Sequence, residues 1–159
     1  MSDEQGLVAA IEAELAPNGF VTKQTAAAFD EVEVVSAWVR KTFQTNRGVM
    51  VLRAHPRTHP GPLSQQLKIA IGKSLGYFPF FYGMGLQLVW IGSGITPLAP
   101  PLDGFVDSID NQRSIVQSIF VVDLASRRWE SARTWGQVVT GKFQDAIERG
   151  IAIWSETTR

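Results

Sequence analysis

The chain has 159 residues, of which 45% are hydrophobic and 19% are charged, and it contains no cysteine. These values are typical of one folded domain, and they exclude a disulfide-stapled scaffold, a cysteine-ligated zinc finger and a thiol nucleophile. Basic and acidic residues balance to a formal net charge of zero, so no overall field draws the chain to nucleic acid or to membranes.

Three segments have the spacing of amphipathic helices, because apolar residues recur in them at every third or fourth position. The first segment ends at a Pro-Asn-Gly turn, and Thr140 is a suitable N-cap for the last. The alanine-rich residues 25–29 are expected to add a helical turn. The three helices are expected over residues 3–15, 63–75 and 141–155.

Strands are predicted where β-branched and aromatic residues cluster between turn signals. The adjacent Val34 and Val35 break the alternation of the first long strand, which predicts a bulge there. Residues 45–48 have the composition of a turn and would join that strand to the next one as a hairpin. The predicted strands cover residues 20–22, 32–42, 49–54, 86–91, 114–124 and 128–135.

The order of these elements predicts an α+β fold, with residues 1–159 as a single domain. We expect a mixed or mostly antiparallel β-sheet of about five to six strands covered by three helices. Residues on the inner stripe of a helix or in the middle of a strand are expected to share one core. They are Trp38, Leu67, Ile71, Trp90, Phe120, Val122, Phe143, Ile147 and Ile151. The restriction-endonuclease-like core and the small type III secretion chaperones have a similar element order, which by itself does not indicate a function.

Basic residues dominate the middle of the chain. Between Val34 and Leu102 there is no Asp or Glu, whereas both histidines and seven Lys or Arg residues lie there. One interpretation is that this segment binds an anion such as a phosphate, a nucleotide or a nucleic-acid backbone. The interpretation that we favour is that these side chains pair with the flanking acids after folding, since a net charge of zero disfavours nucleic-acid binding.

The loop of residues 55–62 is rigid, because it contains three prolines, and it directly precedes the second predicted helix. A small anion at this junction would meet the free amides of the helix and four basic side chains. The candidate anion-binding residues are therefore Arg53, His55, Arg57 and His59. The alternative, which we favour, is that the prolines only reverse the direction of the chain. The two histidines lie four residues apart, but prolines prevent the helix on which they would share a face, so no metal site is expected.

No catalytic constellation emerges from the sequence. A nuclease of the restriction-endonuclease-like kind needs an acid, any residue and then Lys on its second strand, and residues 49–54 contain no acid. The glycines of residues 83–85 and 92–94 lack the spacing of a phosphate loop, so no cofactor is expected. These observations favour a protein that is not an enzyme.

Residues 74–102 carry no charge, but glycines and prolines interrupt them, which favours a buried strand with loops over a membrane span. Strand alternation cannot bury all the aromatic residues around Pro79 on one face. These side chains either fill the core or form an interface. The candidate interface residues are Tyr77, Phe78, Phe80, Phe81 and Tyr82.

Two functions therefore remain. The first is a non-catalytic module that binds a protein partner or a ligand and self-associates as a homodimer through the aromatic segment. The acidic N-terminus lacks the features of a secretion signal, so we expect this module to be cytoplasmic. The alternative is an anion- or nucleic-acid-handling protein that uses the basic segment from Arg40 to Lys73, built on a nuclease-like fold without an intact catalytic motif.

Overall fold

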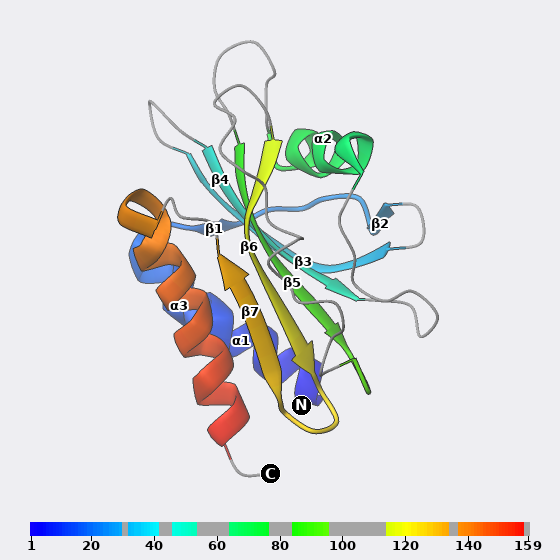
Figure 1. Cartoon of the computed structure of the whole chain (residues 1–159), viewed down its shortest axis with the longest axis vertical. Helices are drawn as coiled ribbons and strands as arrows, with labels where there is room; N and C mark the ends of the chain where they lie inside the picture. Colours follow the sequence, from blue (N-terminus) through cyan, green and yellow to red (C-terminus); the bar gives the residue numbers. More distant parts are fainter. Residues whose placement is uncertain are drawn as a thin grey trace.

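The fold is built on one open sheet of seven strands (Figure 1). A computed structural model describes residues 1–29, 32–41, 46–53, 64–76, 84–95, 114–133 and 137–157. The strands are β1 (Val21–Thr22), β2 (Ala28–Phe29), β3 (Val32–Lys41), β4 (Asn46–Arg53), β5 (Met84–Gly92), β6 (Ser114–Asp123) and β7 (Trp129–Arg133). The helices are α1 (Asp3–Leu15), α2 (Gln65–Ser74) and α3 (Gln137–Glu156), and a short 3-10 helix, η1 (Ala16–Asn18), follows α1.

The sheet is mixed, with the strand order β1-β3-β4-β5-β6-β7. Strands β4, β5 and β6 run parallel, whereas β3 and β7 pair antiparallel with the outer two of them. The predicted α+β class and mixed sheet are therefore confirmed. The sheet has one strand more than the six expected, because the two-residue strand β2 pairs with the outer edge of β3 beside the predicted strand β1.

Strand β5 lies at the centre of the sheet and is buried along most of its length, Met84 to Ile91. A parallel strand that is covered on both faces consists of consecutive apolar residues, because both of its faces are buried. This explains why β5 carries no charged residue. None of the helices in the described ranges has the length and apolar character that a membrane span requires.

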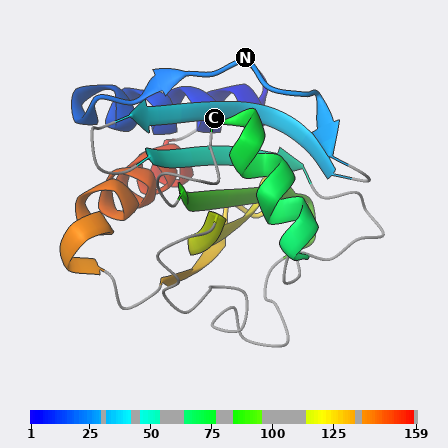
Figure 2. The ribbon, with the colours of Figure 1, turned by 90° about the horizontal axis from the view of Figure 1, so that it is seen from above.

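Helices cover both faces of the sheet, with α1 and α3 side by side on one face and α2 on the other (Figures 1 and 2). The prediction of one core is therefore wrong, because the sheet separates two cores. Ile71 of α2 and Trp90 of β5 belong to the core between α2 and the sheet, with Leu67 packed at its margin. The other six predicted core residues belong to the core between the sheet and the helices α1 and α3.

Helix α1 begins with a capping box, in which Ser2 and Gln5 exchange side-chain and backbone hydrogen bonds. Its buried residues Leu7, Ile11 and Leu15 recur at every fourth position and face the sheet and α3. Helix α3 approaches α1 closely at Gly150, where a Cβ atom would lie 2.7 Å from the Ile11 Cα. A side chain at this position would force the two helices apart.

Several element boundaries differ from those predicted. Residues 28–29 form β2 and not a helical turn, because their backbone pairs with β3. Strand β4 begins at Asn46, inside the expected turn of residues 45–48, since its first residues pair with both β3 and β5. Helix α3 begins at Gln137, so Thr140 lies within the helix and is not its N-cap. The predicted hairpin and the bulge near Val34 are confirmed.

Candidate functional site

One end of the sheet face that α1 and α3 cover is polar. Alternate residues of a strand share a face, so Arg47 faces the same way as Val49 on β4, and Gln87 the same way as Val89 on β5. On β6, Gln117 is the unpaired residue of a bulge, between the pair Leu86–Val116 and the pair Gln87–Ser118. A bulge re-aims a side chain, and this one brings Gln117 to the same place as Arg47 and Gln87.

Hydrogen bonds fix the orientation of these amides. Arg47 Nη1 donates to Gln117 Oε1 over 3.1 Å, and Gln87 Nε2 donates to the same oxygen over 2.8 Å. Since a guanidinium only donates, the oxygen of Gln117, and not its nitrogen, must face Arg47. Gln87 Oε1 in turn accepts from Ser118 Oγ. The Nε2 amide of Gln117 is left as a donor, with no acceptor among the described residues.

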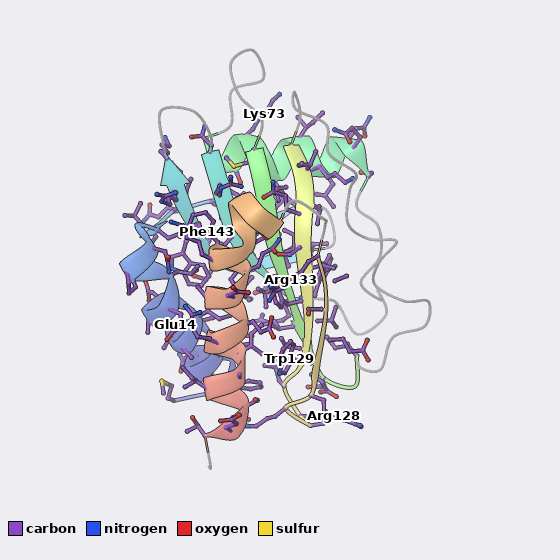
Figure 3. The ribbon with its side chains drawn as sticks, turned by 60° about the vertical axis from the view of Figure 1, so that its left-hand side comes forward. Glu14, Lys73, Arg128, Trp129, Arg133 and Phe143 are labelled. Atoms are coloured by element: carbon purple, nitrogen blue, oxygen red, sulfur yellow. The ribbon has the colours of Figure 1, made fainter. Side chains whose placement is uncertain are left out.

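Phe143 lies on α3 (Figure 3), and three cationic groups lie close to its ring. The guanidinium carbons of Arg40 and Arg47 lie 5.0 and 5.5 Å from the ring centroid, and Lys142 Nζ lies 5.0 Å from it. Arg40 and Arg47 are directly opposite each other in the β3–β4 pair. Together with their polar neighbours, these residues form what we call the Arg47 cluster: Arg40, Arg47, Gln87, Gln117, Ser118, Lys142, Phe143 and Gln144.

Arg47 is buried, with only 6% of its surface exposed, and it forms no ion pair with any carboxylate of the described residues. Burial, and then the nearby charge of Arg40, lower the pKa of the Arg47 guanidinium. The Phe143 ring and one hydrogen bond to Gln117 compensate only part of the lost hydration. Burying a charge without a counter-ion lowers the stability of the folded state, so the burial of Arg47 is energetically unfavourable.

Among the buried and half-buried arginines of the described ranges, only Arg40 and Arg47 lack a carboxylate partner in those ranges. Three further half-buried arginines each pair with at least one carboxylate. These pairs are Arg53 with Glu4 and Glu33, Arg127 with Asp3, and Arg133 with Asp145 and Glu148. Acids are as numerous as bases in the whole chain, yet none of the described ones lies against Arg40 or Arg47.

Two further residues shape the space around Gln117. Gly85 lies beneath its amide, and a Cβ atom there would collide with Gln117 Oε1 and lie 2.9 Å from its Nε2. Gln144 donates its Nε2 to the backbone oxygen of Gln117 over 3.2 Å, while its Oε1 is buried with no donor in the described part of the chain. The cluster thus holds an unpaired cation and an unpaired acceptor close together.

Of the four anion-binding candidates at the end of β4, the structure describes only Arg53. Its guanidinium is held by Glu4, at 2.6 Å, and by Glu33, at 2.5 Å, and the hydrogen bond to Glu4 is the main cause of its raised pKa. His55, Arg57 and His59 lie outside the described residues. The five interface candidates lie outside them as well: Tyr77, Phe78, Phe80, Phe81 and Tyr82.

Other groups of polar side chains in the described ranges are weaker candidates for a binding site. No group of three or more His, Asp or Glu side chains in the described ranges is arranged to hold a metal ion. A depression of about 370 Å³ lies between α1 and β3, with Glu4 and Glu12 on its wall. Both carboxylates are already engaged, Glu4 by Arg53 and Glu12 by the Trp38 indole and the Thr22 hydroxyl. The Arg47 cluster is therefore the strongest candidate site.

Comparison with known proteins identifies no relative: no family model, no curated protein and no solved structure matches the chain.

Part of the cluster was visible in the sequence. Arg40 and Arg47 belong to the predicted basic segment, but the prolines and histidines pointed to the loop after Arg53 and not to the strands. Gln87, Gln117 and Ser118 were missed, although each interrupts an otherwise apolar strand. A polar residue at an inward strand position is the signal that would have found them, because such a residue needs a partner in the interior.

Proposed function

We propose that this protein is a ligand-binding module, not an enzyme, and that its ligand is an anion bound at the Arg47 cluster. The observation that carries the proposal is the burial of Arg47 beside Arg40, with no carboxylate partner among the described residues. An anion at this place would supply the missing counter-charge and form charge-assisted hydrogen bonds with guanidinium groups.

The exposure of the cluster fits such a role. Arg47, Gln87, Ser118 and Gln144 form a buried floor, whereas Arg40 is half-buried and Lys142 is exposed. A ligand can therefore reach the cationic groups from solvent while the floor stays in place. The floor comes from β4, β5, β6 and α3, and rigid elements hold binding groups more accurately than loops do.

A role in binding would explain why the charge of Arg47 is kept without a carboxylate partner among the described residues. Residues that recognise a ligand are commonly kept at a cost in stability. Replacing a buried charged side chain with an apolar one of similar size often leaves the stability of a protein unchanged or raises it. If the charge of Arg47 were needed for folding, such a replacement would lower the stability. Arg47→Met is therefore the variant that separates a binding role from a structural one.

The experiment compares melting temperatures in phosphate and in sodium chloride of the same ionic strength, because phosphate also stabilises proteins non-specifically. Phosphate is expected to raise the melting temperature of the unmodified protein by more than that of Arg47→Met, which should show only the non-specific effect and whose melting temperature in chloride stays equal or rises. The control is the double variant Arg57→Ala with His59→Ala, which alters the loop predicted from the sequence and should keep the phosphate effect. If that double variant loses the effect, or if no anion raises the melting temperature, the proposal is wrong.

Two parts of the sequence-based hypothesis remain predictions. They are the cytoplasmic location and the association with a partner or a second copy through the aromatic segment. Neither depends on the Arg47 cluster, and each can fail without affecting the anion site.

A further inference from the structure

We infer that the anion recognised by the Arg47 cluster is the phosphate group of a small phosphate monoester. This inference rests on the proposed function and adds the chemical class of the ligand. Three features support it: the donor character of the cluster groups that reach solvent, the number of elements from which these donors come, and the small extent of the positive surface along α3.

Within the described part of the chain, the groups of the cluster that lack a partner and reach solvent are donors, whereas the unpaired acceptor Gln144 Oε1 is buried. Arg40 and Lys142 donate by their nature, and the hydrogen bonds from Arg47 and Gln87 leave Gln117 with only its Nε2 amide free. A ligand group that matches them must accept hydrogen bonds with all its oxygens. A fully ionised oxyanion does so, whereas a neutral amide or a sugar hydroxyl would place donor against donor.

These donors come from four different elements. Arg40 lies on β3, Arg47 on β4, Gln117 on β6 and Lys142 on α3, and the three cationic groups lie within 5.5 Å of one ring centroid. A carboxylate has two oxygens in one plane, whereas a phosphate monoester has three terminal oxygens directed tetrahedrally. A dianionic phosphate would also offset more of the three positive charges than a monocarboxylate can.

Among the described residues, the positive surface at the cluster is too short for a nucleic-acid strand. Along α3, Lys142 is followed one turn later by Asp145 and then by Glu148, whose carboxylates are 56% and 42% exposed. The single aromatic ring of the cluster, Phe143, is 1% exposed and cannot stack on a base. Strand-binding proteins rely on a long basic groove and exposed aromatic rings, so a single phosphate group is the better fit.

The first test is calorimetric titration with ethyl phosphate, succinate and a short oligothymidylate, at about 50 mM and about 200 mM salt. Ethyl phosphate is expected to bind at least about tenfold more tightly than succinate. Its affinity should fall no more than about tenfold between the two salt concentrations, against about 10³–10⁵-fold for a protein that contacts six to ten backbone phosphates. Tighter binding of the oligothymidylate, or equal binding of succinate, overturns the inference.

These outcomes also separate the two proposals. If succinate binds as tightly as ethyl phosphate and Arg47→Met abolishes both, the anion site stands and only the ligand class is wrong. If no probe binds, the proposed function fails together with this inference.

The second test supplies the counter-charge from the protein itself. Gln117→Glu keeps the oxygen that accepts from Arg47 and Gln87, but it replaces the free amide donor by a second carboxylate oxygen. We expect a higher melting temperature without ligand, since Arg47 gains an ion pair, and at least about a tenfold loss of affinity for ethyl phosphate. Gln24→Glu adds the same charge at an exposed position in the segment between β1 and β2 and is the matched control.

Two results of this comparison overturn the inference. One is a Gln117→Glu variant that binds ethyl phosphate as tightly as the unmodified protein. The other is an equal loss of affinity in Gln24→Glu, which would show that the overall charge of the protein, and not the cluster, governs binding.

Discussion

Arg127 joins the beginning of α1 to the end of α3, and its replacement by alanine tests how α3 is held. Its guanidinium donates to the backbone oxygens of Trp154, at 3.1 Å, and of Thr157, and it pairs with Asp3 at 2.8 Å. It also lies 5.0 Å from the centroid of the Trp154 ring. All these interactions disappear in Arg127→Ala.

The expected loss follows from the exposure of each partner. The side chain of Arg127 is 19% exposed, so its two bonds to the carbonyl oxygens at the end of α3 contribute about 1 kcal/mol each. The Trp154 contact adds about 0.5–1 kcal/mol, and the half-exposed pair with Asp3 less than about 1 kcal/mol. We therefore expect Arg127→Ala to lower the free energy of unfolding by about 2–4 kcal/mol.

Arg127→Gly provides a second, independent comparison. Arg127 has a φ of 57°, a left-handed conformation that costs a non-glycine residue about 1 kcal/mol. The glycine variant loses the same contacts but relieves this cost, so it should be about 1 kcal/mol more stable than the alanine variant. Urea unfolding at neutral pH measures both differences. A loss below about 0.5 kcal/mol in Arg127→Ala, or a glycine variant less stable than the alanine variant, would refute the reasoning.

Three further predictions concern the cores, a turn and self-association. Ile147→Ala should lower the free energy of unfolding by about 2–5 kcal/mol in urea, because Ile147 is fully buried between α3 and the sheet, and a loss below about 1 kcal/mol would contradict that packing. Burial alone would raise the pKa of Asp123, but hydrogen bonds from Gly94, Ser126 and Ala125 lower it below its ordinary value of 3.8. The ionised Asp123 carboxylate therefore contributes fully to the free energy of unfolding above that value, and this contribution is lost as the pH falls through the lower folded-state pKa. Asp123→Asn should lower the free energy of unfolding by about 1–2 kcal/mol at pH 7, and a difference between the two proteins that stays the same in strong acid would contradict this. The aromatic residues 77–82 predict a homodimer, which size-exclusion chromatography with light scattering would detect and which a strict monomer at high concentration would rule out.

Local patterns in the sequence were sufficient for much of the fold. The fourfold spacing of Leu7, Ile11 and Leu15 identifies α1, and the adjacent Val34 and Val35 mark the bulge of β3. The helical turn expected at residues 25–29 is absent because pairing with β3 overrides a local alanine preference. Local sequence does not encode which strands pair over long distances, so the division into two cores was not predictable.

The candidate site was predictable only in part, for a related reason. The sequence shows a surplus of positive charge between Arg40 and Lys73, but ion pairs depend on contacts between distant residues. Arg53 forms an ion pair with Glu4, which is far away in the chain. Arg47 forms a hydrogen bond with Gln117 and no ion pair with a carboxylate among the described residues. Because of this difference, the candidate anion site lies at the beginning of β4 and not at its end.

The most direct test of the anion site is a side-chain NMR titration of the arginine Nε–Hε groups with inorganic phosphate, with the Arg47 signal assigned by its absence in Arg47→Met. The signals of Arg40 and Arg47 should shift and reach saturation together, while those of Arg53 and Arg127, which already pair with carboxylates, should stay in place. A stationary Arg47 signal, or shifts of all arginines that grow in proportion to the phosphate concentration without saturating, would contradict the account.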